Sequence, residues 1–409
     1  MMAEIKNTKE IYNTEIPSGW EVKKFEKIAK FFSGGTPLTT KPEYYSGDIP
    51  FIKSGEIYFD KTEQFISDEG LNNSSAKMVE KGDLLYALYG ANSGEVAISK
   101  IKGAINQALL CIRHNGDCDT VFIYNYLLHQ KENIIRTYLQ GGQGNLSAEI
   151  VKTLQIPLPP LPEQKAIAQV LSTADAAIQT TEKLIAQKVL RKKWLMQQLL
   201  TGKKRLNGFE NTKWKIQPLE NFIKPIVREV PKPSTPYLGI GLRSHGKGTF
   251  LKHDEQPEKN SMDNFYVVRP NDLIVNITFA WEQAIAIVRP EDDGALASHR
   301  FPTYTFIEDK GHPDFFRFYI LQPRMKFMLQ MISPGGAGRN RVMSKSDFIK
   351  LEFLLPEYEE QSAIAQVLKA ADKEISLLKA KAEKLREQKK GLMQVLLTGK
   401  IRLNLNLQN

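Results

Sequence analysis

The sequence predicts an α+β fold: two mixed α/β domains joined by two long helices that form an antiparallel intramolecular coiled coil. The first observation is an internal repeat, because the stretch 163–206 recurs at 360–403 without a gap and 23 of the 44 aligned residues are identical. The second is a line of mainly apolar residues in each copy, spaced at alternating steps of four and three, which is typical of coiled coils. The third is a series of short apolar runs before each copy, which indicates strands.

The composition of the 409 residues is that of a globular protein, with 42% hydrophobic and 25% charged residues. No apolar run approaches the roughly 18 residues that span a bilayer, and the N-terminus MMAEIKNTKE lacks the layout of a signal peptide. Together with only two cysteines, these features predict a cytoplasmic protein without a membrane partner. The net charge of +10 and the isoelectric point near 9.2 favour a nucleic-acid partner without deciding the question.

The first domain is expected to span residues 1–157. Apolar runs at 48–52, 83–90 and 95–101 are bounded by Gly, Pro, Asn and Asp and predict strands. A helical pattern follows at 121–139.

A helical segment is expected at 158–206, with prolines at its entry and Thr201-Gly202 as its C-terminal stop. The coiled-coil frame carries polar residues at Thr181, Lys188 and Lys192. The apolar members of its seam are Ile167, Leu171, Ala174, Ile178, Ile185, Leu195 and Leu199.

The second domain is expected at 207–350, with strands at 272–281 and 283–288 and a helical pattern at 314–331. It resembles the first domain weakly: WEVKKFE (20–26) parallels WKIQPLE (214–220), and GDLL parallels NDLI. We expect a shared scaffold whose loops diverge, which is how a recognition surface changes its target.

The last segment, 351–409, carries the second long helix, with Lys389 as the polar member of its seam. Each helix should contain about 35 residues and extend roughly 50 Å. The expected arrangement is an antiparallel pair within the chain; the alternative is two helices that each pack on their own domain. The apolar members of the second seam are Ile364, Leu368, Ala371, Ile375, Leu378, Ala382, Leu385, Leu392 and Leu396.

Enzyme motifs are incomplete in this chain. The segment 241–248 reads GLRSHGKG, but a phosphate-binding loop needs Ser or Thr after the lysine and a helix beyond it. The E-x-K spacing at 163–165 is lost in the second copy at 360–362. No D/N-P-P-F/Y tetrapeptide of an amino-methyltransferase occurs, and the six histidines and two cysteines show no metal-binding spacing. We therefore expect a protein without catalytic or metal-binding residues.

The order of domain, helix, domain and helix resembles the specificity subunit of a type I restriction-modification system. The resemblance is carried by IPSGWEVKKF (16–25), SGGTP (33–37), IPLPPLPEQ (156–164) and both EQ-x-AIAQVL segments. It implies that each domain is a target recognition domain that reads one half of a split, asymmetric site in double-stranded DNA. It also implies that the helices act as a spacer and dock two methyltransferase (modification) subunits.

The same resemblance implies restriction/translocase subunits as further partners. It places S-adenosylmethionine, ATP and Mg on the partner subunits and no cofactor on this chain. Two other functions stay open on the residues alone. One is a coiled-coil adaptor whose two domains bind proteins, and the other is a self-contained nuclease, for which no carboxylate cluster is found.

Candidate DNA-binding residues are polar and basic side chains in predicted turns and loops, since Arg can bond guanine bidentately and Asn or Gln adenine. Glycine-rich loops at 141–145 and 335–341 are favoured because glycine lets the backbone approach phosphate closely. The candidates in the first domain are Ser33, Thr36, Thr39, Thr40, Lys41, Tyr44, Tyr45, Lys53, Ser54, Asn92, Gln143 and Asn145. Those in the second are Arg243, Ser244, His245, Lys247, Asn276, Thr278, His299, Arg300, Arg339, Asn340 and Arg341.

Overall fold

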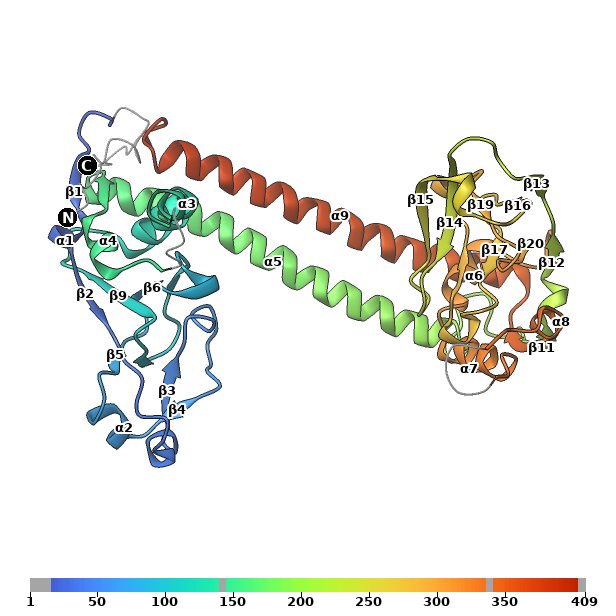
Figure 1. The fold of residues 1–409 in the computed structure, drawn as a ribbon, viewed down its shortest axis with the longest axis horizontal. Coiled ribbons are helices and arrows are strands. Elements are labelled where there is room, and N and C mark those ends of the chain that lie inside the picture. Colours follow the sequence, from blue (N-terminus) through green and yellow to red (C-terminus); the bar gives the residue numbers. More distant parts are fainter. Residues whose placement is uncertain (1–15, 140–144, 336–340, 404–409) are drawn as a thin grey trace. The chain divides into compact units, whose positions relative to one another are not determined.

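The computed structural model describes residues 16–139, 145–335 and 341–403 (Figure 1). Tertiary contacts divide the chain into two compact units: unit 1 is Met1–Glu182 with Ala380–Asn409, and unit 2 is Lys183–Lys379. Both boundaries lie inside the long helices α5 (Leu161–Leu199) and α9 (Tyr358–Leu396), so each unit contains one mixed domain and part of each helix. No helix in the described part of the chain is both long and apolar enough to cross a bilayer.

Unit 1 contains two four-stranded sheets. The first is antiparallel throughout and has the order β2 (Ala29–Ser33), β9 (Leu109–His114), β6 (Leu84–Ala87), β7 (Val96–Ile98). The second has the order β4 (Phe65–Ile66), β3 (Ile49–Ile52), β8 (Gly103–Ile105), β5 (Lys77–Val79), and its central pair β3–β8 is parallel.

The continuous apolar run at β6 has a physical reason, because its sheet is covered on both faces. Leu84 and Tyr86 point into a core shared with α3 (Thr120–Tyr138). Leu85 and Ala87 point to the other face, into a core that also receives residues of β3, β5 and β8. Successive strand residues alternate between faces, so a strand that is buried on both sides needs no polar alternation.

Unit 2 repeats this topology. Its antiparallel sheet has the order β12 (Ile223–Ile226), β20 (Thr303–Phe306), β17 (Leu273–Val275), β18 (Ile285–Ile287). Its second sheet has the order β13 (Glu229–Pro231), β16 (Asn264–Val267), β19 (Leu296–Ala297), β14 (Tyr237–Leu242), β15 (Thr249–Glu255), with β14 and β19 parallel. The added strand is β13 at the edge. The expectation of a shared scaffold therefore agrees with the observed connections.

The helical pattern expected at 314–331 is two helices, α6 (Pro313–Tyr319) and α7 (Pro323–Met331). Pro323 lacks an N–H and occupies the first turn of α7, where that loss costs no hydrogen bond. The carbonyls of Ile320 and Gln322 in the break accept the side-chain amide of Gln283, at 2.8 and 3.4 Å. In unit 1 the pattern at 121–139 is the single helix α3.

A two-stranded ribbon connects the beginning and end of each domain. In unit 1 it pairs β1 (Glu21–Lys24) with β10 (Gln155–Leu158), and in unit 2 it pairs β11 (Lys215–Pro218) with β21 (Glu352–Leu355). The remaining short helices are α1 (Phe25–Ile28), α2 (Asp68–Asn72), α4 (Ala148–Thr153) and α8 (Lys345–Ile349).

Within each unit the parts of α5 and α9 run antiparallel. In unit 1, Asp175 pairs with Lys389 (2.7 Å) and Glu182 with Arg386, so the residue numbers fall along α9 as they rise along α5. In unit 2, Lys188 pairs with Glu374 and Lys192 with Asp372 (2.5 Å), in the same reversed order. The fold class predicted from the sequence, with its antiparallel coiled coil, is therefore confirmed.

The structure places every apolar seam residue in a buried or half-buried position. The polar members also lie inward: Thr181 is buried and donates to the Ala177 carbonyl (2.8 Å), and the seam lysines are half-buried. Each seam lysine reaches an acidic residue on the other helix, so its aliphatic stem covers the seam while its ammonium group stays near solvent.

The repeated glutamine at the start of each long helix fixes a helix of its domain. Gln164 donates to the carbonyl of Pro159 (2.9 Å) and accepts the amide of Asp119 (2.9 Å), the N-cap of α3. Gln361 makes the equivalent contacts in unit 2 and accepts the amide of His312 (2.9 Å), the N-cap of α6. This glutamine therefore joins the start of each long helix to its own domain.

The repeated glutamate binds an arginine from the end of the other repeat. In unit 1, Arg402 binds both carboxylate oxygens of Glu163 (2.6 and 2.7 Å), donates to the Ser18 carbonyl (2.8 Å) and lies over the Trp20 ring (5.8 Å). We call Trp20, Glu163 and Arg402 the unit 1 clasp.

Unit 2 has the same arrangement. Arg205 binds both oxygens of Glu360 (2.7 and 2.6 Å), donates to the Thr212 carbonyl (2.6 Å) and lies over the Trp214 ring (5.6 Å). We call Trp214, Glu360 and Arg205 the unit 2 clasp. Each clasp therefore ties the end of one repeat to the start of the other repeat and to the start of a domain.

Candidate nucleic-acid interface

The two domains share a hairpin that aligns residue by residue, with 82–98 matching 271–287. A strand, a single 3-10 turn and a returning strand follow one another in both: β6, η3 (Gly90–Asn92) and β7 in unit 1, and β17, η6 (Ala280–Glu282) and β18 in unit 2. Gly94 (φ +81°) and Gln283 (φ +63°) occupy the same left-handed position of the alignment. A side chain strains this backbone conformation, and the Gln283 side chain donates a buried hydrogen bond to Ile320 and a partly buried one to Gln322 there.

A bidentate ion pair supports the start of each hairpin. Arg113 binds Asp83 at 2.8 and 2.5 Å, and Arg228 binds Asp272 at 2.5 and 3.1 Å. Burial raises the pKa of the Asp83 carboxyl, but hydrogen bonds from the Arg113 guanidinium and the Glu80 amide lower it by more. The pKa of this carboxyl therefore lies below its usual range. These pairs stabilise the hairpin that presents the turns.

In unit 1 the hairpin turn and four other segments lie close together where the strands end. The Asn92 side chain donates to Ser54 (3.4 Å), the Gly90 amide donates to the Asn145 side chain (3.3 Å), and Thr36 donates to Gln107 (2.7 Å). We call residues 34–36, 53–55, 88–92, 106–108 and 145 the rim of unit 1.

The rim of unit 1 brings together four candidates from the sequence, Thr36, Ser54, Asn92 and Asn145, and includes half-buried Lys53. Ser33 is half-buried at the end of β2, directly before the rim.

The remaining candidates of unit 1 lie around η2 (Pro42–Tyr45). Thr39, Thr40 and Lys41 are exposed, whereas Tyr45 is half-buried and donates to the Pro37 carbonyl (2.7 Å). Tyr44 is only 3% exposed, and its hydroxyl accepts the Lys41 ammonium (3.0 Å). Tyr44 therefore supports Lys41 and is not placed to reach a base itself.

In unit 2 the equivalent turn η6 meets the loop between β14 and β15. Ser244 donates to the Glu282 carboxylate (2.5 Å), and the His245 amide donates to the Glu282 carbonyl (2.6 Å). The Ile277 amide donates to the Arg300 carbonyl (3.0 Å), and the Arg341 guanidinium lies 5.2 Å from the centre of the Trp281 ring. We call residues 243–248, 276–282, 298–302 and 341–345 the rim of unit 2.

Most candidates of unit 2 lie on this rim, and the exposed ones are Arg243, His245, Lys247, His299 and Arg300. Ser244, Thr278 and Arg341 are half-buried. Asn276 is 9% exposed, and its side-chain oxygen accepts the Thr278 amide (3.0 Å), so this oxygen shapes the turn.

Gln143, Arg339 and Asn340 lie outside the described residues, together with most of both glycine-rich loops.

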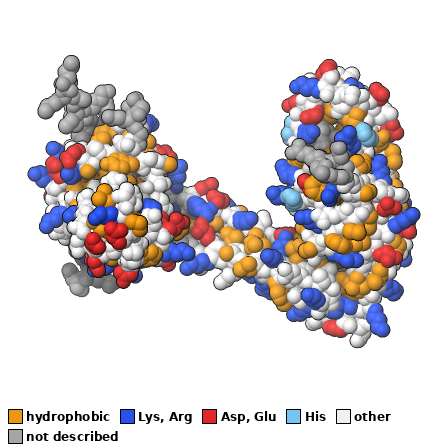
Figure 2. Space-filling view, turned by 60° about the horizontal axis from the view of Figure 1, so that its bottom comes forward, with side chains coloured by type: hydrophobic (Ala, Val, Ile, Leu, Met, Phe, Trp, Pro, Cys, Tyr) orange, Lys and Arg blue, Asp and Glu red, His pale blue; other side chains and the backbone are white. Residues whose placement is uncertain are grey.

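The two rims differ in charge. The rim of unit 2 contains five Lys or Arg residues and one acidic residue, Glu282, whereas the rim of unit 1 contains Lys53 as its charged residue and is otherwise rich in amides and hydroxyls. Figure 2 shows histidine side chains of unit 2 among Lys and Arg on the face in view. A basic rim attracts phosphate, and an amide-rich rim offers directional hydrogen bonds.

Sequence reasoning missed Tyr89, Gln107, Trp281 and Glu282. Tyr89 is exposed next to η3, and Trp281 occupies the position that Asn92 has in the aligned hairpin. Extending the GDLL/NDLI match along the chain would have identified both turns.

Other chemistry finds little support among the described residues. The segment 241–248 leads into strand β15, not into the helix that a phosphate-binding loop requires. The described part of the chain contains no cluster of three His, Cys, Asp or Glu residues that could hold a metal ion. Burial raises the pKa of the Cys111 thiol to about 12 and that of Cys118 to about 11, which suppresses the nucleophilic thiolate.

Known proteins resemble the chain over nearly its full length. Residues 17–188 and 229–387 match the family model described as "Type I restriction modification DNA specificity domain". The chain is 26% identical over 434 aligned positions to the type I restriction enzyme MjaVIII specificity subunit of Methanocaldococcus jannaschii, covering 98% of this chain and 97% of that protein. It is 28% identical over 423 positions to the putative MjaX specificity subunit of the same organism, covering 95% of each.

Solved structures share the fold. The S subunit of a type I system from M. genitalium matches with a TM-score of 0.54 and 15% identity, over 94% of this chain and 97% of that one. The HsdS subunit from Thermoanaerobacter tengcongensis matches with a TM-score of 0.53 and 16% identity, over 95% and 99%.

Proposed function

The chain belongs to the type I restriction-modification DNA specificity family, and we propose that it is the non-catalytic subunit that directs its partners to a bipartite, asymmetric DNA site. The observation that carries this proposal is the pair of rims: one scaffold, used twice in one chain, presents two chemically different sets of side chains. Two unlike readers on one chain would recognise two unlike half-sites, because specificity comes from the side chains at base edges.

We propose that residues 1–157 and 207–350 are the two recognition domains and that the helical segments 158–206 and 351–409 form the spacer. Contacts with DNA are assigned to the exposed and half-buried residues of the rims. The amides Asn92, Gln107 and Asn145 suit adenine, and Arg300 and Arg341 suit guanine. We infer that the half-site of unit 1 contains adenine and that the half-site of unit 2 contains guanine.

The partners we propose are two methyltransferase subunits on the paired helices, with restriction/translocase subunits added to that complex in the cytoplasm. S-adenosylmethionine, ATP and Mg would then be bound by the partners. The MjaVIII and MjaX relatives are specificity subunits by name, which supports an equivalent role for this chain.

The test is co-expression. The purified chain alone should methylate no DNA, and co-expression with its methyltransferase should place methyl groups on adenine at one interrupted motif, mapped across the host genome. Methylation by the chain alone, or methylation without a shared motif, would contradict the proposal.

A protein-binding adaptor is the alternative, and salt distinguishes the two functions. If the chain reads DNA, the logarithm of its association constant for DNA should fall linearly with the logarithm of salt concentration, because phosphate contacts release counterions. Binding is measured on a duplex that carries the mapped motif and on one with a scrambled motif. An adaptor would bind neither duplex.

A further inference from the structure

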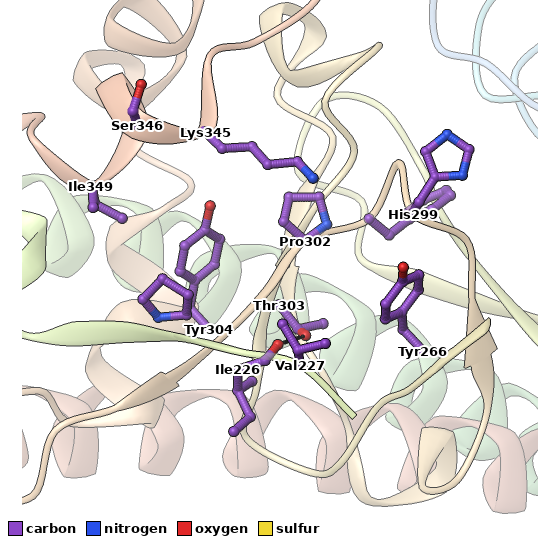
Figure 3. A pocket seen from close by; sticks show the side chains of 12 residues that line it. Ile226, Val227, Tyr266, His299, Pro302, Thr303, Tyr304, Lys345, Ser346 and Ile349 are labelled. Atoms are coloured by element: carbon purple, nitrogen blue, oxygen red, sulfur yellow. Dashed lines mark hydrogen bonds between the residues drawn. The ribbon is translucent and has the colours of Figure 1, made fainter. Parts of the chain in front are cut away.

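A pocket of about 390 Å³ opens beside the rim of unit 2 (Figure 3). Its walls come from β12, β16, β20, α8 and the loop before β20. Tyr266 and Phe301 supply aromatic rings, and Val227 and Ile349 supply aliphatic surface. Lys345, the first residue of α8, is the permanent cation among the lining residues. The pocket therefore combines an apolar interior with one positive charge.

A tyrosine hydroxyl in this pocket has no hydrogen-bond partner among the described residues. Tyr304 is 2% exposed, and its ring packs on Phe348 with a centroid distance of 5.2 Å. Its hydroxyl faces the pocket, and no described residue forms a hydrogen bond with it, whereas the neighbouring Thr303 donates to the Ile226 carbonyl (3.0 Å). Burial raises the pKa of Tyr304 to about 12, so the hydroxyl keeps its proton. The hydroxyl is therefore free to donate a hydrogen bond to a ligand in the pocket.

Unit 1 lacks these features at the equivalent positions. Ile112 corresponds to Tyr304, because each lies opposite the first residue of the central strand, β6 or β17. Phe31 lies beside Ile112, where unit 2 has a proline beside Tyr304. Ala148 corresponds to Lys345, because each follows the serine N-cap of a short helix. The shared scaffold therefore does not require the hydroxyl or the cation, which belong to unit 2.

The pocket and the rim share one segment of chain. His299, Phe301 and Pro302 line the pocket, and exposed Arg300 between them belongs to the rim. A phosphate held by Arg300 would therefore lie beside the pocket.

We propose that the pocket holds one unstacked nucleotide, with its base against the rings of Tyr266 and Phe301 and its phosphate at Lys345. Bases stack on aromatic side chains, and the Tyr304 hydroxyl can donate to a ring nitrogen or carbonyl of the base. The volume lies near the lower end of the range of about 300–1,000 Å³ for ligand pockets, so it suits one nucleotide and not two. The nucleotide comes either from the DNA strand on the rim, which rests on the proposed function, or from solution.

The DNA source is tested in the complex of the full chain with its methyltransferase, on a duplex that carries the mapped motif. One 2-aminopurine replaces each base of the duplex in turn, and its fluorescence rises severalfold when the base leaves the stack. A rise is expected at the methylated adenine, because enzymes that modify a base extrude it. A second rise is expected at one position in or beside the half-site of unit 2. Val227→Trp, which fills the pocket, and Tyr304→Phe should lower the second rise relative to the first. Ile216→Trp adds the same ring elsewhere on unit 2, at an exposed position, and should keep the ratio of the two rises.

The solution source is tested by titrating dAMP, dGMP, dCMP and TMP against the full chain, with saturation-transfer NMR as the measurement. Lys345→Ala should lower the affinity for the nucleotide that binds by about fivefold or more. Lys350 is an exposed lysine outside the pocket, so Lys350→Ala should leave that affinity unchanged.

A second fluorescence rise that the pocket variants lower supports the DNA source. Binding of a free nucleotide that depends on Lys345, without a second fluorescence rise, supports the solution source. Absence of both, with methylation of the motif intact, overturns the pocket proposal and leaves the proposed function standing. If the unaltered complex methylates no specific motif, the proposed function is overturned. The titration with free nucleotides then tests the pocket proposal by itself.

Discussion

At the scale of single residues, the clasps explain why the two repeats carry the same residues at both of their ends. Glu163 and Glu360 are almost fully buried, and each is neutralised by an arginine that lies some 40 residues further along the aligned repeat in the other copy. A buried carboxylate without its cation is costly. The arginine after each Thr-Gly stop is therefore required by the glutamate that opens the other helix.

Removal of a clasp arginine should destabilise the unit that contains it. The side chain of Arg205 is 18% exposed and that of Arg402 is 40% exposed, so solvent compensates the loss of Arg402 more effectively. We expect Arg205→Ala to lower the free energy of unfolding by about 3 kcal/mol and Arg402→Ala by about 2 kcal/mol. Urea denaturation measures the change, and hydrogen exchange followed by mass spectrometry assigns it to unit 2 or unit 1.

Arg386→Ala is the matched control. Arg386 pairs with Glu182 and Glu383 at an exposed position on α9, where solvent screens the ion pairs and they contribute little to stability. Equal losses for Arg386→Ala and Arg205→Ala would show that burial of the carboxylate does not determine the energy of the clasp.

The sequence identified candidate residues by type, but type does not determine exposure. Tyr44 and Tyr45 are adjacent aromatic residues in a predicted loop, yet the first is buried and the second is half-buried. Asn276 is an amide in a predicted turn, but its oxygen is used by the turn itself. These differences arise from tertiary packing, which local residue patterns do not contain.

At the scale of elements, the two long helices were predictable because each helix of 39 residues repeats its seam pattern many times. The short strands were predictable as apolar runs, but the rims were not. Ser54, Asn92 and Asn145 meet because strands of three to six residues pair in a particular register. A shift of one residue turns every side chain to the other face, and short runs contain too little pattern to fix that register.

We expect the seam lysines of α5 to stabilise the helix pair less than apolar residues would, which makes their replacement informative. Lys188 is half-buried between the apolar seam residues Ile185 and Leu195, and its partner Glu374 is well exposed. In Lys188→Leu, loss of the ion pair should therefore lower the free energy of unfolding only slightly, and apolar burial should raise it by about 1 kcal/mol. The measurement is the urea midpoint of unit 2, and Lys193→Leu, an exposed position on the same helix, should not raise that midpoint. A lower midpoint for Lys188→Leu would show that the ion pair, and not burial, dominates at this position.

At the scale of the whole molecule, one topology occurs twice, with the same order of strands apart from the added β13, the same hairpin and the same clasp. The clasps and the glutamine contacts are built from residues that the two copies share, whereas the rims are built from residues that they do not share. A chain organised in this way can change one rim without disturbing the clasp, the hairpin or the other rim. Recognition of the two half-sites should therefore be separable by mutation.

That separation gives a direct prediction for the methylation motif. Asn92→Ala removes an amide from the rim of unit 1 and should relax the motif at one half-site, and Arg300→Ala removes a guanidinium from the rim of unit 2 and should relax it at the other. Each lost base contact should reduce discrimination by about 1–3 kcal/mol at one base pair, because the effects of separate contacts are roughly additive. Genome-wide mapping of methylated adenine in cells with each variant measures the change.

Lys247→Ala is the control for the guanidinium variant. Loss of a rim lysine that holds phosphate should weaken binding to all DNA sequences alike, and it should lower the slope of the logarithm of the association constant against the logarithm of salt concentration by about one. The double variant Asn92→Ala with Arg300→Ala should relax both half-sites by the sum of the single effects. If either single variant relaxed both half-sites, the two rims would be energetically coupled. The independence that follows from two separately clasped domains would then be wrong.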